Sequence, residues 1–142
     1  MWMYDPTLVQ PMREELTSIG FKELRTPEDV DSAMQNSRGT TLLVVNSVCG
    51  CAAGQARPGV ALALTNDIVP DNLYTVFAGQ DPEATARARS YIKGYPPSSP
   101  SLALFKDGEL VEMLERHQIE NHSAQEVAAK LIEIFQKHCN SK

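Results

Sequence analysis

The feature that most constrains the fold is a strongly apolar run from Thr40 to Ser47, Thr-Thr-Leu-Leu-Val-Val-Asn-Ser. The run is rich in β-branched residues and lacks the alternation of a strand with one wet face, so it predicts a strand buried on both faces. Such a strand needs helices on both sides of its sheet. Its apolar part, 41–45, is far too short to cross a bilayer, and we expect no membrane segment.

The flanking segments supply the rest of an α/β fold. Helical spacing and capping signals predict helices over Thr7–Ile19, from Pro27 to about Asn36, Ala52–Thr65, Asp81–Tyr91 and Ser123–His138. Further strands are predicted over Phe21–Arg25, Leu73–Ala78, Ser101–Phe105 and Glu109–Leu114. The Asp107-Gly108 turn between the last two indicates a β-hairpin. We therefore expect a three-layer α/β/α domain spanning residues 1–142, with a mixed sheet, a closing hairpin and a C-terminal helix.

Charge and cysteine usage exclude several classes. The net charge is −5 and no basic block occurs, so neither nucleic acid nor an anionic membrane surface is an expected partner. The N-terminus lacks a basic start followed by an apolar run, which predicts a cytoplasmic protein without a signal peptide. Three cysteines in such a chain do not suit a structural disulfide framework. They are buried and inert, metal ligands, or redox-active.

The triplet Cys49-Gly50-Cys51 directly follows the buried strand and precedes a predicted helix. The N-terminus of a helix favours a thiolate, the nucleophile of disulfide exchange, through its unpaired N–H groups and positive dipole end. No Lys or His adjoins the pair, so we expect the helix terminus to provide most of the stabilisation of the thiolate. Arg57 stabilises the thiolate only if its side chain reaches back. The setting predicts a redox-active pair with Cys49 and Cys51 as the reactive residues.

Gly50 has a predicted role of its own. A disulfide between Cys49 and Cys51 closes a smaller ring than one across two residues, and glycine tolerates the unusual dihedrals that this requires. Strain of this kind favours the dithiol. We therefore expect a stronger oxidant than a relaxed C-x-x-C disulfide.

Two other interpretations of the pair stay open. Both thiols are small enough to be inert core residues. A zinc or copper site would also use them, and its candidate ligands are Cys49, Cys51, Cys139 and one of His117, His122 and His138. The distant ligands lack the usual C-x-x-C or H-x-x-x-H spacing, so we expect no metal and no bound cofactor.

A proline opens the predicted hairpin strand at Ser99-Pro100. By itself Pro100 is an ordinary edge or loop residue. The complete order, however, resembles the thioredoxin fold: strand, cysteine pair, proline-containing helix, strand, helix, proline before a hairpin, and closing helix. In that fold the hairpin proline is cis and lies against the cysteine pair. The resemblance implies this for Pro100, and implies that Pro58 is the kink proline of the active-site helix.

Longer segments resemble the bacilliredoxin family over nearly the whole chain. They are Gln10–Leu16, Gly20–Leu24, Val45–Ala52, Ala56–Gly59, Gly94–Pro100, Arg116-His117 and His138-Cys139. The resemblance implies a bacterial cytosolic enzyme with a C-G-C site that reduces mixed disulfides between proteins and the small thiol bacillithiol. By position Cys49 attacks and Cys51 is its partner. Cys139 matches a C-terminal cysteine of the family and is a possible extra thiol, more consistent with a peripheral position than with a resolving role.

The expected function is a thiol–disulfide oxidoreductase that removes bacillithiol, or a similar low-molecular-weight thiol, from protein mixed disulfides. Its partners are then the capped proteins and the small thiol as co-substrate, and the backbone of Ser99 pairs with the substrate chain. A protein disulfide isomerase or a general thioredoxin-like reductase would use the same residues. A metal-binding protein using the Cys-x-Cys pair is the alternative from another class.

Overall fold

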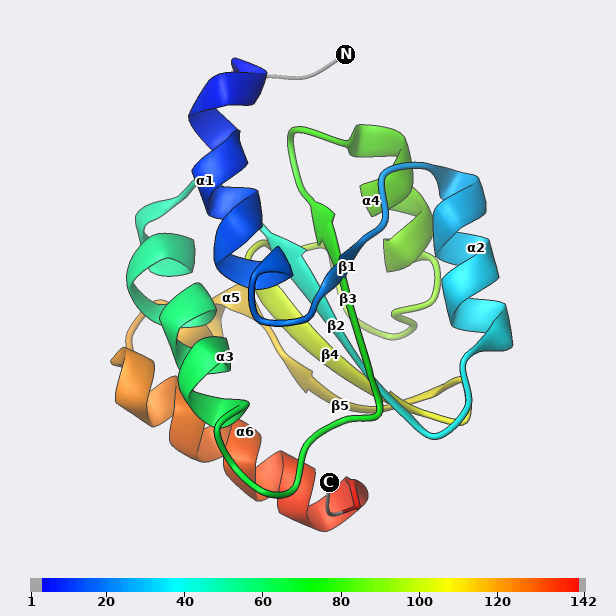
Figure 1. The fold of residues 1–142 in the computed structure, drawn as a ribbon, viewed down its shortest axis with the longest axis vertical. Coiled ribbons are helices and arrows are strands. Elements are labelled where there is room, and N and C mark those ends of the chain that lie inside the picture. Colours follow the sequence, from blue (N-terminus) through cyan, green and yellow to red (C-terminus); the bar gives the residue numbers. More distant parts are fainter. Residues whose placement is uncertain (1–3, 141–142) are drawn as a thin grey trace.

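The computed structural model describes residues 4–140 and contains a five-stranded sheet in the order β1-β3-β2-β4-β5 (Figure 1). The strands are β1 (Lys22–Glu23), β2 (Thr40–Asn46), β3 (Asn72–Phe77), β4 (Ser101–Lys106) and β5 (Glu109–Leu114). β3 is parallel to both β1 and β2, whereas β4 is antiparallel to β2 and β5 is antiparallel to β4. The mixed sheet with its closing hairpin is confirmed. The first strand is shorter than the predicted Phe21–Arg25, because only two residues pair with β3.

Helices cover both faces of the sheet (Figure 1). One face carries α1 (Pro6–Thr17), α3 (Arg57–Ala63), α5 (Arg116–Ile119) and α6 (Ala124–His138), and the other carries α2 (Pro27–Asn36) and α4 (Pro82–Arg89). All seven residues of β2 are buried. Leu42 and Val44 pack toward the first set of helices, and Leu43 and Val45 toward the second. The two-sided burial predicted for this strand, and the three-layer fold, are confirmed.

The segment after the cysteine pair differs from the single kinked helix predicted over Ala52–Thr65. A π-helical turn, η1 (Ala52–Ala56), comes first, and α3 follows with Pro58 in its first turn. Proline has no N–H to donate to the carbonyl four residues earlier, so the irregular turn lies directly before it. Gly59 lets α3 approach α6 closely, since an added Cβ would lie 2.7 Å from Cγ1 of Val127.

Strand register brings three distant segments to one edge of the sheet. Val45 at the end of β2 pairs with Ser101 at the start of β4. Leu102 pairs in turn with Leu114 at the end of β5. The loop after β2, the segment before β4 and the start of α5 therefore lie at the same edge. None of the helices in residues 4–140 is long and apolar enough to cross a membrane.

Candidate active site

The cysteine pair lies where β2 ends and the helical segment begins. The backbone N–H groups of Ala52 and Ala53 donate to the carbonyl of Cys49, at 3.1 and 3.2 Å. The N–H of Cys49 donates to Oγ of Ser47 at 3.1 Å. Both cysteines are free and half-buried, and their Sγ atoms are 2.9 Å apart. The local backbone thus holds two thiols within proton-transfer distance of each other.

The two thiols differ in acidity. Burial raises the pKa of Cys49, but hydrogen bonds from Cys51 and Ser47, the N–H of Ala52 and the charge of Arg116 together hold that pKa below its ordinary value. Burial also raises the pKa of Cys51, and the hydrogen bond and charge of Cys49 raise it further. Deprotonation therefore favours Cys49, while Cys51 keeps its proton. The helix terminus does contribute through Ala52, yet the two side-chain hydrogen bonds exceed it, contrary to the expectation from sequence.

Arg57 stabilises the end of β2 instead of reaching back to the thiols. Its side chain is buried, and Nη1 donates to Oδ1 of Asn46 at 2.9 Å and to the carbonyl of Ser47 at 2.7 Å. Nε lies 3.1 Å from a carboxylate oxygen of the half-exposed Glu15. Arg57 is thus a positioning residue for the turn that carries Cys49.

Pro100 and Ser99 are at the same edge as the cysteines. The Ser99–Pro100 peptide bond is cis, in agreement with the resemblance. Pro100 is buried and directly precedes Ser101, which pairs with Val45 near the end of β2. Ser99 is half-buried, and its carbonyl accepts a hydrogen bond from Nη1 of Arg116 at 3.3 Å.

Arg116 is the site residue to which sequence reasoning gave no role. It begins α5, and its charge lowers the pKa of both cysteine thiols. Its backbone N–H donates to Oγ of Ser98 at 3.4 Å, and its Nε to Oε2 of Glu120 at 3.1 Å. Two signals were available: the resemblance segment Arg116-His117, and the register of the hairpin, which places the residues after β5 beside the proline before β4.

Gly50 adopts no left-handed backbone in this dithiol state, and an added Cβ would meet nothing within 4 Å. The structure of the dithiol therefore does not require glycine at this position. The strained-disulfide role stays a prediction about the oxidised form.

Cys139 lies far from the pair. It follows α6, and the side chain of Thr40, the first residue of β2, hydrogen-bonds its thiol. Burial raises the pKa of Cys139. The length of β2, about 20 Å at 3.3 Å per residue, separates this thiol from the Cys49 end. Without unfolding, Cys139 cannot resolve a disulfide at Cys49.

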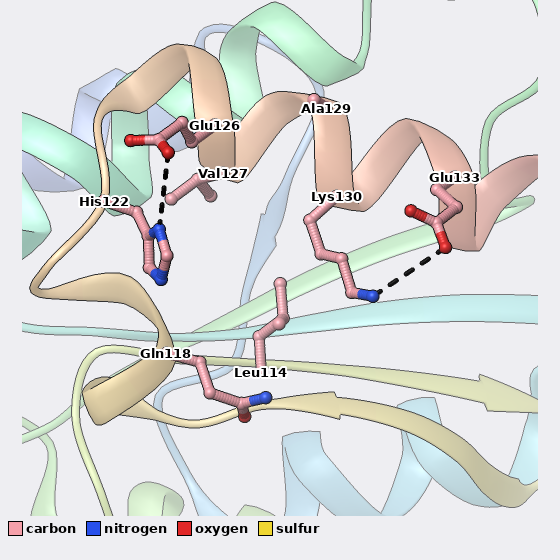
Figure 2. Close-up of a pocket in the computed structure, with 8 residues that line it drawn as sticks. All are labelled: Leu114, Gln118, His122, Glu126, Val127, Ala129, Lys130 and Glu133. Atoms are coloured by element: carbon pink, nitrogen blue, oxygen red, sulfur yellow. Dashed lines mark ion pairs between the residues drawn. The ribbon is translucent and has the colours of Figure 1, made fainter.

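Within residues 4–140, no group of three or more His, Cys, Asp or Glu side chains is placed to hold a metal ion, so the candidate zinc ligands are not assembled. A hollow of about 490 Å³ lies between α5, α6 and the end of β5, and none of its lining residues is a cysteine (Figure 2). Its polar side chains pair with one another, as His122 with Glu126 and Lys130 with Glu133. The thiol pair thus lies at a surface edge outside this hollow.

Comparison with known proteins agrees with this geometry. Residues 4–139 match the family model described as disulphide isomerase. A bacilliredoxin of Bacillus cereus is 58% identical over 132 residues, covering 93% of this chain and 91% of the relative. A bacilliredoxin of Staphylococcus aureus is 52% identical over 140 residues, covering 99% and 96%.

Solved structures establish the fold. Fasciola hepatica thioredoxin superposes with a TM-score of 0.58 at 22% identity, covering 83% of this chain and 99% of that one. Mitochondrial thioredoxin 3 of Saccharomyces cerevisiae gives 0.56 at 14% identity, covering 87% and 98%. With its family relatives and its free thiol pair, the chain belongs to the bacilliredoxin family and is a thiol–disulfide oxidoreductase of thioredoxin-like fold.

Proposed function

We propose that this protein removes bacillithiol, or a similar low-molecular-weight thiol, from protein mixed disulfides in the cytoplasm. The observation that carries the proposal is the asymmetry of the pair: the pKa of Cys49 is lowered and that of Cys51 is raised, with the sulfurs 2.9 Å apart. Cys49 is therefore the nucleophile of the proposed reaction, and Cys51 lies beside it as a protonated thiol.

The proposed reaction has two exchange steps. The Cys49 thiolate attacks the small-thiol sulfur of the mixed disulfide, an S–S bond forms between Cys49 and the small thiol, and the protein leaves as a thiolate. A second small thiol then attacks the sulfur of the bound small thiol and expels the Cys49 thiolate, or Cys51, after losing its proton, attacks the sulfur of Cys49 and expels the small thiol. The first route returns the dithiol and releases a small-thiol disulfide. The second leaves a Cys49–Cys51 disulfide and releases the small thiol, so the pair has been oxidised and the substrate reduced.

The segment before β4, at the same edge of the sheet as the cysteine pair, is the proposed binding site for the protein substrate. Ser99 precedes Pro100 at the start of β4, and its backbone can pair with an extended substrate segment, as in strand addition. The carbonyl of Ser99 already accepts one hydrogen bond from Arg116, and a carbonyl oxygen has a second lone pair for another donor.

The test compares one model protein capped with bacillithiol, glutathione or cysteine. We expect faster release of bacillithiol than of the other two caps by the full chain. Equal rates for the three would remove the preference for bacillithiol while leaving general mixed-disulfide reduction. Replacing Cys51 with Ser should trap the cap on Cys49, whereas Cys49→Ser should trap nothing. Trapping by Cys49→Ser alone would reverse the assignment of the attacking thiol.

Disulfide isomerisation is a second candidate, favoured by the description of the matching family model. It would use the same thiolate on an ordinary protein disulfide. Recovery of activity by a scrambled, disulfide-bonded ribonuclease measures it. Isomerisation as the main activity predicts rapid recovery together with slow removal of every small cap.

A further inference from the structure

Arg116 connects the start of α5 to the segment before β4. Nη1 donates to the carbonyl of Ser99, and the backbone N–H donates to the hydroxyl of Ser98. The side chain is 47% exposed, so its guanidinium group is open to solvent at the rim of the site. Among the Arg, Lys, Asp and Glu side chains of residues 4–140, Arg116 exerts the strongest charge effect on both thiols.

Much of the hydrogen-bonding capacity of this guanidinium group is unused. A guanidinium group has five N–H donors. Nε points to Glu120 and one N–H of Nη1 to Ser99, while the other three have no partner in the described part of the chain. Glu120 is itself 40% exposed, so solvent screens this ion pair and an incoming anion can compete with it.

We propose that Arg116 is a specificity-determining residue that binds a carboxylate of the small thiol while that thiol is disulfide-bonded to Cys49. The inference rests on the proposed function and names its substrate class, acid-bearing small thiols. An arginine binds a carboxylate through two parallel N–H bonds, and the unused donors provide them. The same cation that favours the Cys49 thiolate thus selects the cap. A carboxylate could also come from an acidic side chain of the capped protein, so the test keeps that protein constant.

The experiment uses one model protein with a single cysteine, capped either with 3-mercaptopropionate or with its neutral amide. These caps are close in size and shape, and only the first carries a negative charge at neutral pH. Single-turnover rates of cap removal are measured for the wild type, for Arg116→Gln and for Arg87→Gln. Arg87 is a matched control because it is 44% exposed and ion-paired to Asp31 on another part of the molecule.

We expect the ratio of the acid-cap rate to the amide-cap rate to fall about three- to tenfold in Arg116→Gln and to stay unchanged in Arg87→Gln. Added salt should lower the same ratio in the wild type. A purely structural role of Arg116, or an effect on the thiols alone, predicts equal slowing for both caps and would overturn the inference. Failure of the wild type to remove either cap would instead contradict the proposed function.

Discussion

A cysteine lies beside each end of β2, and the pKa values of the two thiols are shifted in opposite directions. At the C-terminal end, hydrogen bonds from Cys51 and Ser47 and the charge of Arg116 outweigh burial and lower the pKa of Cys49. At the N-terminal end, one hydrogen bond from Thr40 and the charge of Lys106 do not offset burial and the charge of Asp71, and the pKa of Cys139 is raised. Both cysteines are half-buried. The difference shows that the balance of hydrogen-bond donors and neighbouring charges, more than exposure, sets the acidity of each thiol here.

The polar contacts that fix the two ends differ as well. Buried Arg57 holds Asn46 and Ser47 at the reactive end. At the other end exposed Asp71 accepts hydrogen bonds from the N–H and the hydroxyl of Thr40. A buried charge with several partners is costly to disrupt, whereas water replaces the partners of an exposed carboxylate.

The largest contrast is expected from removing each thiol in turn. Cys49→Ser should lower the rate of cap removal at least about a hundredfold, because the nucleophile is lost. Cys139→Ser should leave the rate within about twofold, since its thiol lies at the far end of β2. Steady-state assays on folded variants measure both. A similar loss in the two variants would remove the distinction between the ends.

The polar contacts at the two ends should differ in their effect on stability. Arg57→Met keeps an apolar stem but leaves the buried carbonyl of Ser47 unpaired and removes one of the two donors to Oδ1 of Asn46. We expect it to lower the free energy of unfolding by about 2–4 kcal/mol. Asp71→Ala should cost about 1 kcal/mol or less. Urea denaturation gives both values, and equal losses would contradict the comparison.

Thiol alkylation as a function of pH compares the two ends directly. Only the thiolate reacts. The lowered pKa of Cys49 gives thiolate at a lower pH than an ordinary cysteine, whereas the raised pKa of Cys139 means that its thiolate forms only at a higher pH. Iodoacetamide should therefore modify Cys49 at a lower pH than Cys139, and severalfold faster at pH 7. Peptide mass spectrometry locates each modification. The reverse order would show that burial dominates at both ends.

The smallest effect is expected from single hydroxyl groups. Ser47→Ala removes a hydrogen bond that lowers the pKa of Cys49, so the pKa should rise and cap removal at pH 7 should slow about two- to fivefold. The difference in rate should vanish at a pH well above the ordinary thiol pKa, where Cys49 is a thiolate in both the wild type and the variant. Thr40→Val, beside Cys139, is the matched control and should keep the wild-type rate. A slowing that persists at high pH would mean that Ser47 acts by positioning.

Most of the fold could be predicted because its signals are local. The apolar run of β2 and the Asp107-Gly108 turn are readable from short segments, and the structure confirms both of them. The π-helical turn before Pro58 was not predicted. A proline signals an irregularity in a helix, but packing decides which irregularity forms.

The site was predictable only in part, for a related reason. Cys49 and Cys51 could be predicted because they directly follow a buried strand in the sequence. Arg116 is distant in the sequence, and only the strand register brings its charge close enough to affect their pKa values. The side chain of Arg57 was expected to favour the thiolate only if it reached back, and instead it donates to buried acceptors of Asn46 and Ser47. Side-chain partners of this kind depend on the assembled fold.

The position of Arg116 after the closing hairpin has a consequence for the order in which the protein is made. Cys49 and Cys51 leave the ribosome well before β4, β5 and Arg116. Contacts between distant parts of a chain form only after a long loop has closed. A nascent chain that ends before β4 carries both thiols without their neighbouring strand and without the cation. The Cys49 thiol therefore acquires its full acidity only after the closing hairpin and Arg116 have been made, which limits disulfide exchange by the emerging chain.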